Sequence, residues 1–453
     1  MGRLFGTDGV RGRAGEPPLD ADTIRRLGAA LVRALRQEGG PDAVPGPIRF
    51  LSGRDTRESG SWIERELSYG IASEDAAFTS AGVMPTPAVA YLTPRLGYTA
   101  GVVISASHNP FADNGIKVFS GGGAKLTDLL EQRVEAIVAD ASWSVAPGEA
   151  PPAPQADLRQ DYLAHLADIV RGRDLSSLRL VVDCANGATT TIAPRLFAQL
   201  GVDAHVIAAE PDGRNINLRC GSTDPERLAE TVVRGGYRLG VAYDGDGDRA
   251  IFVDAAGRVV DGDAVMLMCA RRLKSEGRLK GNAVVATVMS NIGLEIALRQ
   301  ADIDIVRCPV GDKHVMQEML ERGLSLGGEQ SGHVIFSDHL FTGDGLATSL
   351  HVLDTMRATG RELADLASDL IAYPQVLMNL RVARKVDLAA IPEIAAVIAS
   401  VEDRLANRGR LLVRYSGTEP LLRVMLEGQD EAEIRRWGQE ILDAVQRHSG
   451  AAA

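Results

Sequence analysis

The chain has 453 residues, of which 45% are hydrophobic and 24% are charged, and its 60 acidic and 49 basic residues give a net charge of −11. This composition is typical of a soluble globular protein of about three domains, and the acidic balance argues against nucleic acid or an anionic membrane as the main partner. The four cysteines are scattered, the N-terminus lacks the apolar core of a signal peptide, and no apolar run reaches the length of a membrane span, so we expect a reduced, cytoplasmic protein.

The first 154 residues predict an α/β unit with a mostly parallel sheet, because strand patterns alternate with helix patterns. Asp20 caps an amphipathic helix, and Gly39-Gly40 ends it. The stretch 146–154 is rich in proline and has no apolar pattern, so it predicts a linker to the next unit. The other elements expected here are a strand at 48–51, a helix at 60–73, strands at 101–104 and 113–118, and a helix at about 127–140.

One serine stands where an α/β sheet would present it to a ligand. The apolar residues 101–104 run into Ser105-Ala106-Ser107-His108-Asn109-Pro110, which is the pattern of a buried strand ending in a loop. Ligands gather at the carboxyl ends of such strands, so Ser107 is a candidate nucleophile, with His108 beside it. Taken alone, the same residues are more often a simple turn before a proline.

Two further α/β units and a smaller C-terminal unit follow. The second unit has a helix at 158–169 and strands at 178–182 and 239–243, and the third has a helix from Asp263 and strands at 283–287 and 324–326. The last part has helices at 391–405 and 431–447 and strands at 411–413 and 422–426. We therefore expect three tandem α/β domains with mixed or parallel sheets, followed by a smaller α+β domain. The expected boundaries are 1–154, 155–255, 256–372 and 373–453.

Three aspartates stand at alternate positions directly after the strand 239–243. Asp244, Asp246 and Asp248 are separated only by glycines, which let the backbone fold so that the carboxylates converge. Crowded carboxylates repel one another unless a cation neutralises them, and hard divalent cations such as Mg²⁺ prefer oxygen ligands. An EF-hand is excluded, because its sixth and twelfth positions would be Arg249 and Ala255. A metal site with Arg249 beside it is favoured over a solvated acidic turn.

Two later loops carry groups that suit a phosphosugar. The loop between the last two strands and its flanks offer hydroxyls, a bare backbone amide and two guanidinium groups, from Arg414, Ser416, Gly417, Thr418 and Arg423. The loop after the strand 324–326 offers Glu329, Ser331 and His333 to sugar hydroxyls. Each loop alone could be a plain turn. Neither a P-loop nor a nucleophile elbow occurs, which disfavours a nucleotide-dependent kinase and an α/β-hydrolase.

Five segments occur in a fixed order along nearly the whole chain, namely Phe5 to Gly12, Ser105 to Pro110, Asp244 to Arg249, Gly328 to His333 and Arg414 to Pro420. Together they resemble the signature loops of the α-D-phosphohexomutase superfamily. The resemblance implies four domains around one central cleft, with one loop from each domain. It also implies an intramolecular phosphotransferase of the isomerase class, whose resting form carries a phosphoryl group on Ser107.

The resemblance implies roles for individual residues. Mg²⁺ would be held by phospho-Ser107 and by the residues that match the metal loop, Asp244, Asp246 and Asp248. Lys117 and Arg11 match positions near the transferring phosphoryl group. Lys117 is the first candidate for the general acid or base, and His108 and His333 are further catalytic candidates. The substrate contacts implied are Arg249, Glu329, Ser331, Arg414, Ser416, Gly417, Thr418 and Arg423. A glucose or glucosamine 1,6-bisphosphate would serve as priming activator.

The substrate branch depends on fewer residues. Gln330 resembles the branch that interconverts glucosamine 6-phosphate and glucosamine 1-phosphate through a bisphosphate and feeds UDP-N-acetylglucosamine and cell-wall precursor synthesis. Phosphomannomutase/phosphoglucomutase relatives, the alternative, usually carry Met there. Gly311-Asp312-Lys313-His314 departs from the commoner Gly-Asp-Arg-Tyr, and Tyr415 stands where Lys is frequent. A metal-dependent phosphatase and an inactive sugar-phosphate binder are the remaining rivals, and a homodimer is left open.

Overall fold

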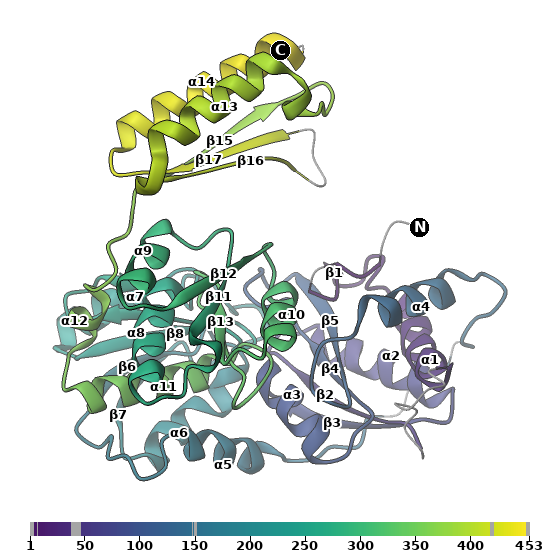
Figure 1. Cartoon of the computed structure of the whole chain (residues 1–453). Coiled ribbons are helices and arrows are strands. Elements are labelled where there is room, and N and C mark those ends of the chain that lie inside the picture. Colours follow the sequence, from purple (N-terminus) through teal and green to yellow (C-terminus); the bar gives the residue numbers. More distant parts are fainter. Residues whose placement is uncertain are drawn as a thin grey trace. The chain divides into compact units, whose positions relative to one another are not determined.

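The computed structural model of the chain describes residues 4–6, 8–37, 47–146, 148, 152–416 and 421–449. The chain divides into a larger unit, Met1–Met289 with Ile303–Asp369, and a smaller unit, Ser290–Asp302 with Leu370–Ala453 (Figure 1). Among the described residues, no helix combines the length and the apolar character that crossing a membrane requires.

The first sheet of the larger unit presents the serine loop. Its strand order is β1-β5-β4-β2-β3, in which β2 runs parallel to β3 and β4, whereas β5 runs antiparallel to β4 and β1. All residues of β4 are buried, as expected of a central strand. The strands are Val10–Arg13 (β1), Arg49–Arg54 (β2), Ala77–Val83 (β3), Ala100–Ile104 (β4) and Asp113–Ser120 (β5).

The second and third sheets contain the aspartate loop and the sugar loop. Their strand orders are β10-β9-β8-β6-β7 and β12-β11-β13-β14. The strands of the second sheet are Arg179–Asp183 (β6), Asp203–Ile207 (β7), Leu239–Tyr243 (β8), Ala250–Asp254 (β9) and Val259–Val260 (β10). Those of the third sheet are Ala283–Thr287 (β11), Asp304–Cys308 (β12), Leu326–Gly328 (β13) and Val334–Phe336 (β14).

All three sheets share one connectivity, which puts a functional loop at the same place in each. In each sheet a strand (β4, β8 or β13) lies parallel to an earlier strand (β2, β6 or β11) and is followed by an antiparallel strand (β5, β9 or β14). The loops at these reversals are 105–112, 244–249 and 329–333. The predicted mixed α/β fold is confirmed, and the common strand order supports a tandem relation between the three units.

Helices pack against these sheets (Figure 1). The predicted cap of α1 is present, because Asp20 Oδ1 accepts the Thr23 N–H at 3.0 Å. Helices α1 and α2 approach so closely that a Cβ on Gly70 would lie 2.0 Å from the Arg25 carbonyl oxygen, so only glycine fits there. The helices of the larger unit are Ala21–Gln37 (α1), Gly60–Ala72 (α2), Thr86–Arg95 (α3), Asp128–Ala139 (α4), Arg159–Ile169 (α5), Ala193–Gln199 (α6), Glu226–Gly235 (α7), Gly262–Ser275 (α8), Asp312–Arg322 (α10), Gly345–Thr359 (α11) and Leu363–Ala367 (α12), with short 3-10 turns at Ala188–Thr191 and Lys280–Asn282.

The smaller unit has the predicted α+β organisation. Its antiparallel sheet has the order β15-β17-β16, and α13 and α14 cover it around a core of apolar side chains (Figure 1). Its elements are Ile292–Gln300 (α9), Gln375–Arg381 (β15), Pro392–Leu405 (α13), Arg410–Tyr415 (β16), Leu421–Glu427 (β17) and Glu431–Ser449 (α14), with 3-10 turns at Leu388–Ala390 and Ala406–Arg408.

Candidate active site

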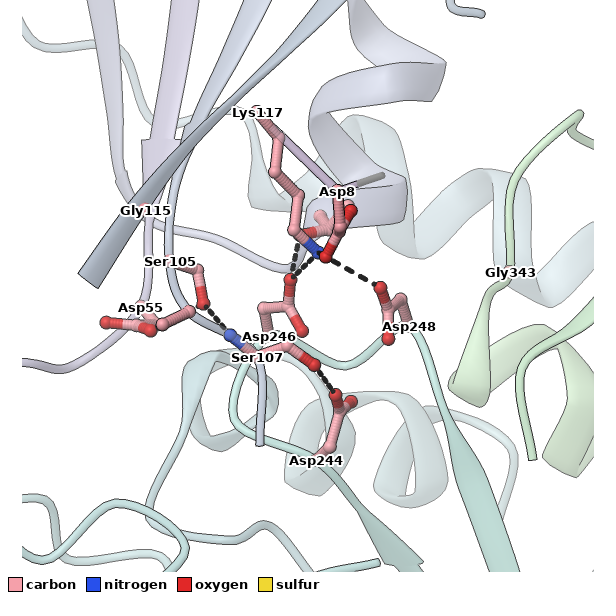
Figure 2. Close-up of polar contacts among 12 residues, drawn as sticks. Asp8, Asp55, Ser105, Ser107, Gly115, Lys117, Asp244, Asp246, Asp248 and Gly343 are labelled. Atoms are coloured by element: carbon pink, nitrogen blue, oxygen red, sulfur yellow. Dashed lines mark hydrogen bonds and ion pairs between the residues drawn. The ribbon is translucent and has the colours of Figure 1, made fainter. Parts of the chain in front are cut away.

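Ser107 follows β4, and its hydroxyl is directed at the aspartate loop of the second sheet (Figure 2). Its Oγ donates to Asp244 Oδ2 at 2.5 Å, across 137 positions of sequence. The Nδ1 atom of His108 lies 3.3 Å from the same Oγ. Ser107 is only 1% exposed, so this contact is made away from bulk water. The candidate nucleophile therefore touches the candidate metal ligands.

The three aspartates converge in a buried cluster (Figure 2). Each offers a carboxylate oxygen within 4.8 Å of the other two. One oxygen of Asp246 and one of Asp248 are buried without a hydrogen-bond partner among the described residues. Burial raises the pKa of Asp244 well above its usual value, and the neighbouring carboxylates of Asp248 and Asp246 raise it further. A divalent cation would satisfy these oxygens and offset their repulsion, so the donor set fits a hard metal ion.

Lys117 on β5 balances part of this negative charge. Its Nζ lies 2.9 Å from Asp246 Oδ2, 3.3 Å from Asp248 Oδ2 and 3.1 Å from Asp8 Oδ2. Burial alone would lower the pKa of Lys117, but the carboxylates of Asp246, Asp8 and Asp248 outweigh burial and hold it well above its usual value. Lys117 is therefore a fixed positive charge, which favours a role as hydrogen-bond donor over one as proton acceptor.

Two arginines contact the serine loop. Arg11 on β1 donates from Nη1 to the Ala106 carbonyl at 3.4 Å and pairs through Nη2 with Asp8. Arg249, at the end of the aspartate loop, places Nη1 at 3.1 Å from Nδ1 of His108. Burial lowers the pKa of His108, and Arg249 and Arg11 lower it further, so the imidazole is neutral. The positive charge beside the serine loop thus comes from the guanidinium groups.

His333 is the last residue of the sugar loop, and its buried side chain lies beside Asp248 of the aspartate loop. Its Nε2 accepts the Gly343 N–H at 3.0 Å, so the neutral ring carries its proton on Nδ1, which lies 3.7 Å from Asp248 Oδ2. Burial opposes a charge on this ring, but Asp248 and then Asp312 raise the pKa of His333 above its usual value. Its protonated nitrogen therefore faces the aspartate loop.

The rest of the sugar loop is more open. Glu329 Oε1 accepts the Gly311 N–H at 3.2 Å, and Gln330 Nε2 donates to Asp261 Oδ2 at 3.0 Å. Ser331 is exposed. A cleft of about 470 Å³ separates this loop from the N-terminal segment and the serine loop, and it is lined by Leu4, Gly6, Asp8, Gly9, Arg11, His108, Asp248, Arg249, Val310, Gly311, Asp312, Glu329 and His333. A cleft of this volume suits a small polar ligand.

The predicted phosphate-binding residues lie in the smaller unit, and two of them, Gly417 and Thr418, fall outside the described residues. Arg414 on β16 lies directly opposite Arg423 on β17. The Ser416 carbonyl accepts a hydrogen bond from Lys385 Nζ at 2.6 Å. This end of the small sheet therefore brings together three cationic side chains, of which the sequence analysis did not include Lys385.

A chain of ion pairs connects the two walls of the cleft. It consists of Asp8, Lys125 and Asp312, to which the sequence analysis gave no role. Lys125 Nζ lies 2.7 Å from Asp8 Oδ1 and 2.5 Å from Asp312 Oδ2. Asp8 in turn contacts Lys117. A signal for two of them existed, since Asp8 lies in the glycine-rich N-terminal segment and Asp312 follows Gly311. Nothing in the local pattern marks Lys125.

Comparison with known families covers the chain with four models. They are described as phosphoglucomutase/phosphomannomutase alpha/beta/alpha domain I at residues 2–144, domain II at 160–257 and domain III at 261–373, and the C-terminal domain at 377–444. The fold is also that of a phosphoglucomutase/phosphomannomutase family protein from Burkholderia thailandensis, with a TM-score of 0.81 and 24% identity over 99% of this chain and 98% of that one.

The sequence is close to those of bacterial enzymes. A phosphoglucosamine mutase of Solibacter usitatus is 48% identical over 457 residues, which cover 99% of each chain. One of Koribacter versatilis is 45% identical over 461 residues, which cover 99% of this chain and 97% of that one. With this identity over the whole length, and with all four domain models in order, the chain belongs to the phosphoglucosamine mutases of the α-D-phosphohexomutase superfamily.

Proposed function

We propose that the chain interconverts glucosamine 6-phosphate and glucosamine 1-phosphate through a phosphorylated Ser107 and a sugar bisphosphate. The observation that carries this proposal is the contact of the Ser107 hydroxyl with Asp244, inside a cluster that also holds Asp246, Asp248 and Lys117. A hydroxyl that carries a phosphoryl group needs nearby positive charge and a metal site, and this cluster offers both.

The proposed reaction has two balanced transfers. The free hydroxyl of the sugar monophosphate attacks phosphorus on phospho-Ser107, a new P–O bond forms, the P–Oγ bond breaks with its electron pair going to Oγ, and the sugar hydroxyl gives up its proton. The bisphosphate then presents its other phosphate to Ser107, and the same step in reverse regenerates phosphoserine. The isomeric monophosphate leaves. A sugar 1,6-bisphosphate is proposed to supply the first phosphoryl group.

Asp244, Asp246 and Asp248 are proposed to hold one Mg²⁺ together with a phosphoserine oxygen. When bound, this ion would neutralise charge on the phosphoryl oxygens as the P–O bonds change. The fit rests on the buried, unpartnered oxygens of Asp246 and Asp248, since oxygen donors are what Mg²⁺ prefers. A solved relative, the N-acetylphosphoglucosamine mutase of Aspergillus fumigatus, was crystallised with GlcNAc-6P and magnesium. Its TM-score to this chain is 0.61 at 17% identity, over 98% of this chain and 96% of that one, so the likeness extends to the fold alone.

The other site residues are proposed to bind charge and move a proton. Lys117 and Arg11 would stabilise the phosphoryl group in transfer. Neutral His108 and the Nδ1 proton of His333 are the groups that could exchange a proton with the sugar hydroxyl or the serine oxygen. Arg249 would add positive charge beside the serine loop.

The sugar and the phosphate that is not transferred would be bound by the two later loops. Glu329, Gln330 and Ser331 present a carboxylate, an amide and a hydroxyl to the sugar side. The phosphate would be bound in the smaller unit, by Arg414, Ser416, Gly417, Thr418, Arg423 and Lys385. The boundaries 1–154, 155–255, 256–372 and 373–453, a cytoplasmic location and homodimer formation stay proposals alongside this assignment.

The proposal is tested by following glucosamine, glucose and mannose 6-phosphates side by side by ³¹P NMR. We expect 1-phosphate to form fastest from glucosamine 6-phosphate, and only with Mg²⁺ and a priming bisphosphate. A preference for glucose or mannose phosphates would assign the phosphomannomutase/phosphoglucomutase reaction. Release of inorganic phosphate without isomer would assign a phosphatase.

A further inference from the structure

The backbone of the active-serine loop is held in an unusual conformation. Ser107 has a φ of +52°, in the left-handed region that residues with a side chain rarely adopt. Such a conformation persists only where the surroundings enforce it, and it is concentrated at functional sites. The contacts that enforce it come from Arg57, Ser105 and Asn217, none of which lines the cleft.

Arg57 makes most of these contacts. Its side chain is fully buried, and Nη2 donates to the carbonyl oxygens of Ser107 at 3.0 Å and Asn109 at 2.8 Å, while Nη1 donates to that of Pro110. One planar guanidinium thus gathers three carbonyls of the loop. Its charge is balanced by Asp55, whose Oδ2 accepts from Nε at 2.8 Å.

Two further side chains act on the same peptide groups. Ser105 Oγ accepts the Ser107 N–H at 2.9 Å and donates to Asp55 at 2.6 Å, so the amide side of the loop is tied to the same ion pair (Figure 2). Asn217, which follows the second sheet's β7, donates from Nδ2 to the carbonyls of Ser107 at 2.9 Å and Asn109 at 3.2 Å. The Ser107 carbonyl therefore accepts two donors.

We propose that Arg57 is a positioning residue for phosphoryl transfer, which acts by turning the carbonyl oxygens of residues 107, 109 and 110 away from the phosphoryl group. With these negative dipole ends directed at the guanidinium, the anionic phosphoryl oxygens meet the hydroxyl side of the loop and the cations around it. A lysine cannot replace this arrangement, because its ammonium lacks the planar fork that reaches three acceptors at once. The inference rests on the proposed function.

Arg57→Lys is the first test, with Arg54→Lys as matched control. Arg54 is the last residue of β2, and its side chain contacts Glu64 on α2. We expect Arg57→Lys to lower kcat about 100-fold with KM for glucosamine 6-phosphate changed less than about threefold, because the loss falls on the transfer step alone. The single-turnover rate of transfer from prephosphorylated enzyme should fall by the same factor. Arg54→Lys should keep wild-type kcat.

Asn217→Gly is the second test of the inference, and it applies if Arg57→Lys does not fold. Its φ of +57° suits glycine, so the change removes two donors without new backbone strain. We expect kcat to fall about tenfold at unchanged KM and melting temperature. Wild-type kcat in either folded variant, or a loss confined to KM, would overturn the inference. Absence of mutase activity in the wild-type enzyme would instead refute the proposed function.

Discussion

The two walls of the cleft in the larger unit are built in different ways. On the serine–metal side, Ser107, Lys117 and the three aspartates are at most 4% exposed and contact one another directly. On the sugar side, Glu329 and Gln330 are half-buried and Ser331 is exposed. The difference indicates that the groups proposed for phosphoryl transfer are organised before substrate binds, whereas the groups proposed for sugar recognition gain further contacts from the ligand.

The largest effect is expected from Ser107→Ala, which removes the proposed phosphoryl carrier. Activity should fall about 10³-fold or more, since no other nucleophile is placed in the described cluster. We do not expect Ser105 to take over, because its hydroxyl donates to Asp55 and accepts the Ser107 N–H. The measurement is isomer formation by ³¹P NMR, with a thermal melt as folding control. Retained turnover would contradict the assignment.

Lys117→Met should have the next largest effect, because it leaves buried carboxylates unbalanced and removes a donor to the phosphoryl group. We expect kcat to fall about 10²-fold and the melting temperature to drop. Adding Asp8→Asn should restore part of the stability without restoring kcat. If the double variant regained full activity, Lys117 would be a structural charge only.

On the sugar side, Gln330→Met should change selectivity more than rate. The Gln330 amide is held by Asp261, and a thioether cannot replace it. We expect the ratio of kcat/KM for glucosamine over glucose 6-phosphate to fall about tenfold, with the single-turnover rate of prephosphorylated enzyme little changed. A selectivity loss that came entirely from slower transfer would remove the distinction between the two walls.

The smallest effect concerns the stability of the folded chain at low pH rather than its catalysis. Burial, together with the nearby His339, lowers the pKa of His165 to about 4, and the centroid of its ring lies 3.8 Å from that of Tyr91 in a stacked arrangement. The unfolded chain then binds a proton below about pH 6.5 that the folded chain resists, so stability falls between pH 6.5 and 4. With allowance for partial exposure, we expect His165 to account for about 1 kcal/mol. His165→Phe should flatten the melting temperature between pH 7 and 5, and an unchanged slope would exclude this origin.

Local pattern predicts much of the fold. The Asp20 cap, the buried strand β4 and the strand before Asp244 could each be predicted from a short window, because apolar period and capping are local properties. The strand before the sugar loop was expected at 324–326 and lies at Leu326–Gly328, since glycines carry no apolar signal. The antiparallel direction of the strand after each loop (β5, β9 and β14) follows from the chain reversal at that loop, which the alternation of helix and strand patterns does not reveal.

Local pattern does not predict which loops contact one another. Ser107 and Asp244 are 137 positions apart, and only the family resemblance indicated that they share a site. Lys117 was the first acid/base candidate, but the three carboxylates that raise its pKa come from two distant segments, the N-terminal segment with Asp8 and the loop with Asp246 and Asp248. The sequence shows Arg57 in the segment after β2 but predicts no role for it. Its hydrogen-bond acceptors are backbone carbonyls, which no side-chain pattern marks.

The proposed reaction requires that one phosphoryl group passes between Ser107 and the sugar. The most direct measurement is to label the enzyme with a sugar 1,6-bisphosphate, map the phosphate by peptide mass analysis, and chase it with glucosamine 6-phosphate. We expect one phosphate per chain, on Ser107, which leaves the enzyme at the rate at which isomer forms. Phosphate on another residue, or isomer formed while the label stays on the protein, would contradict the proposed reaction.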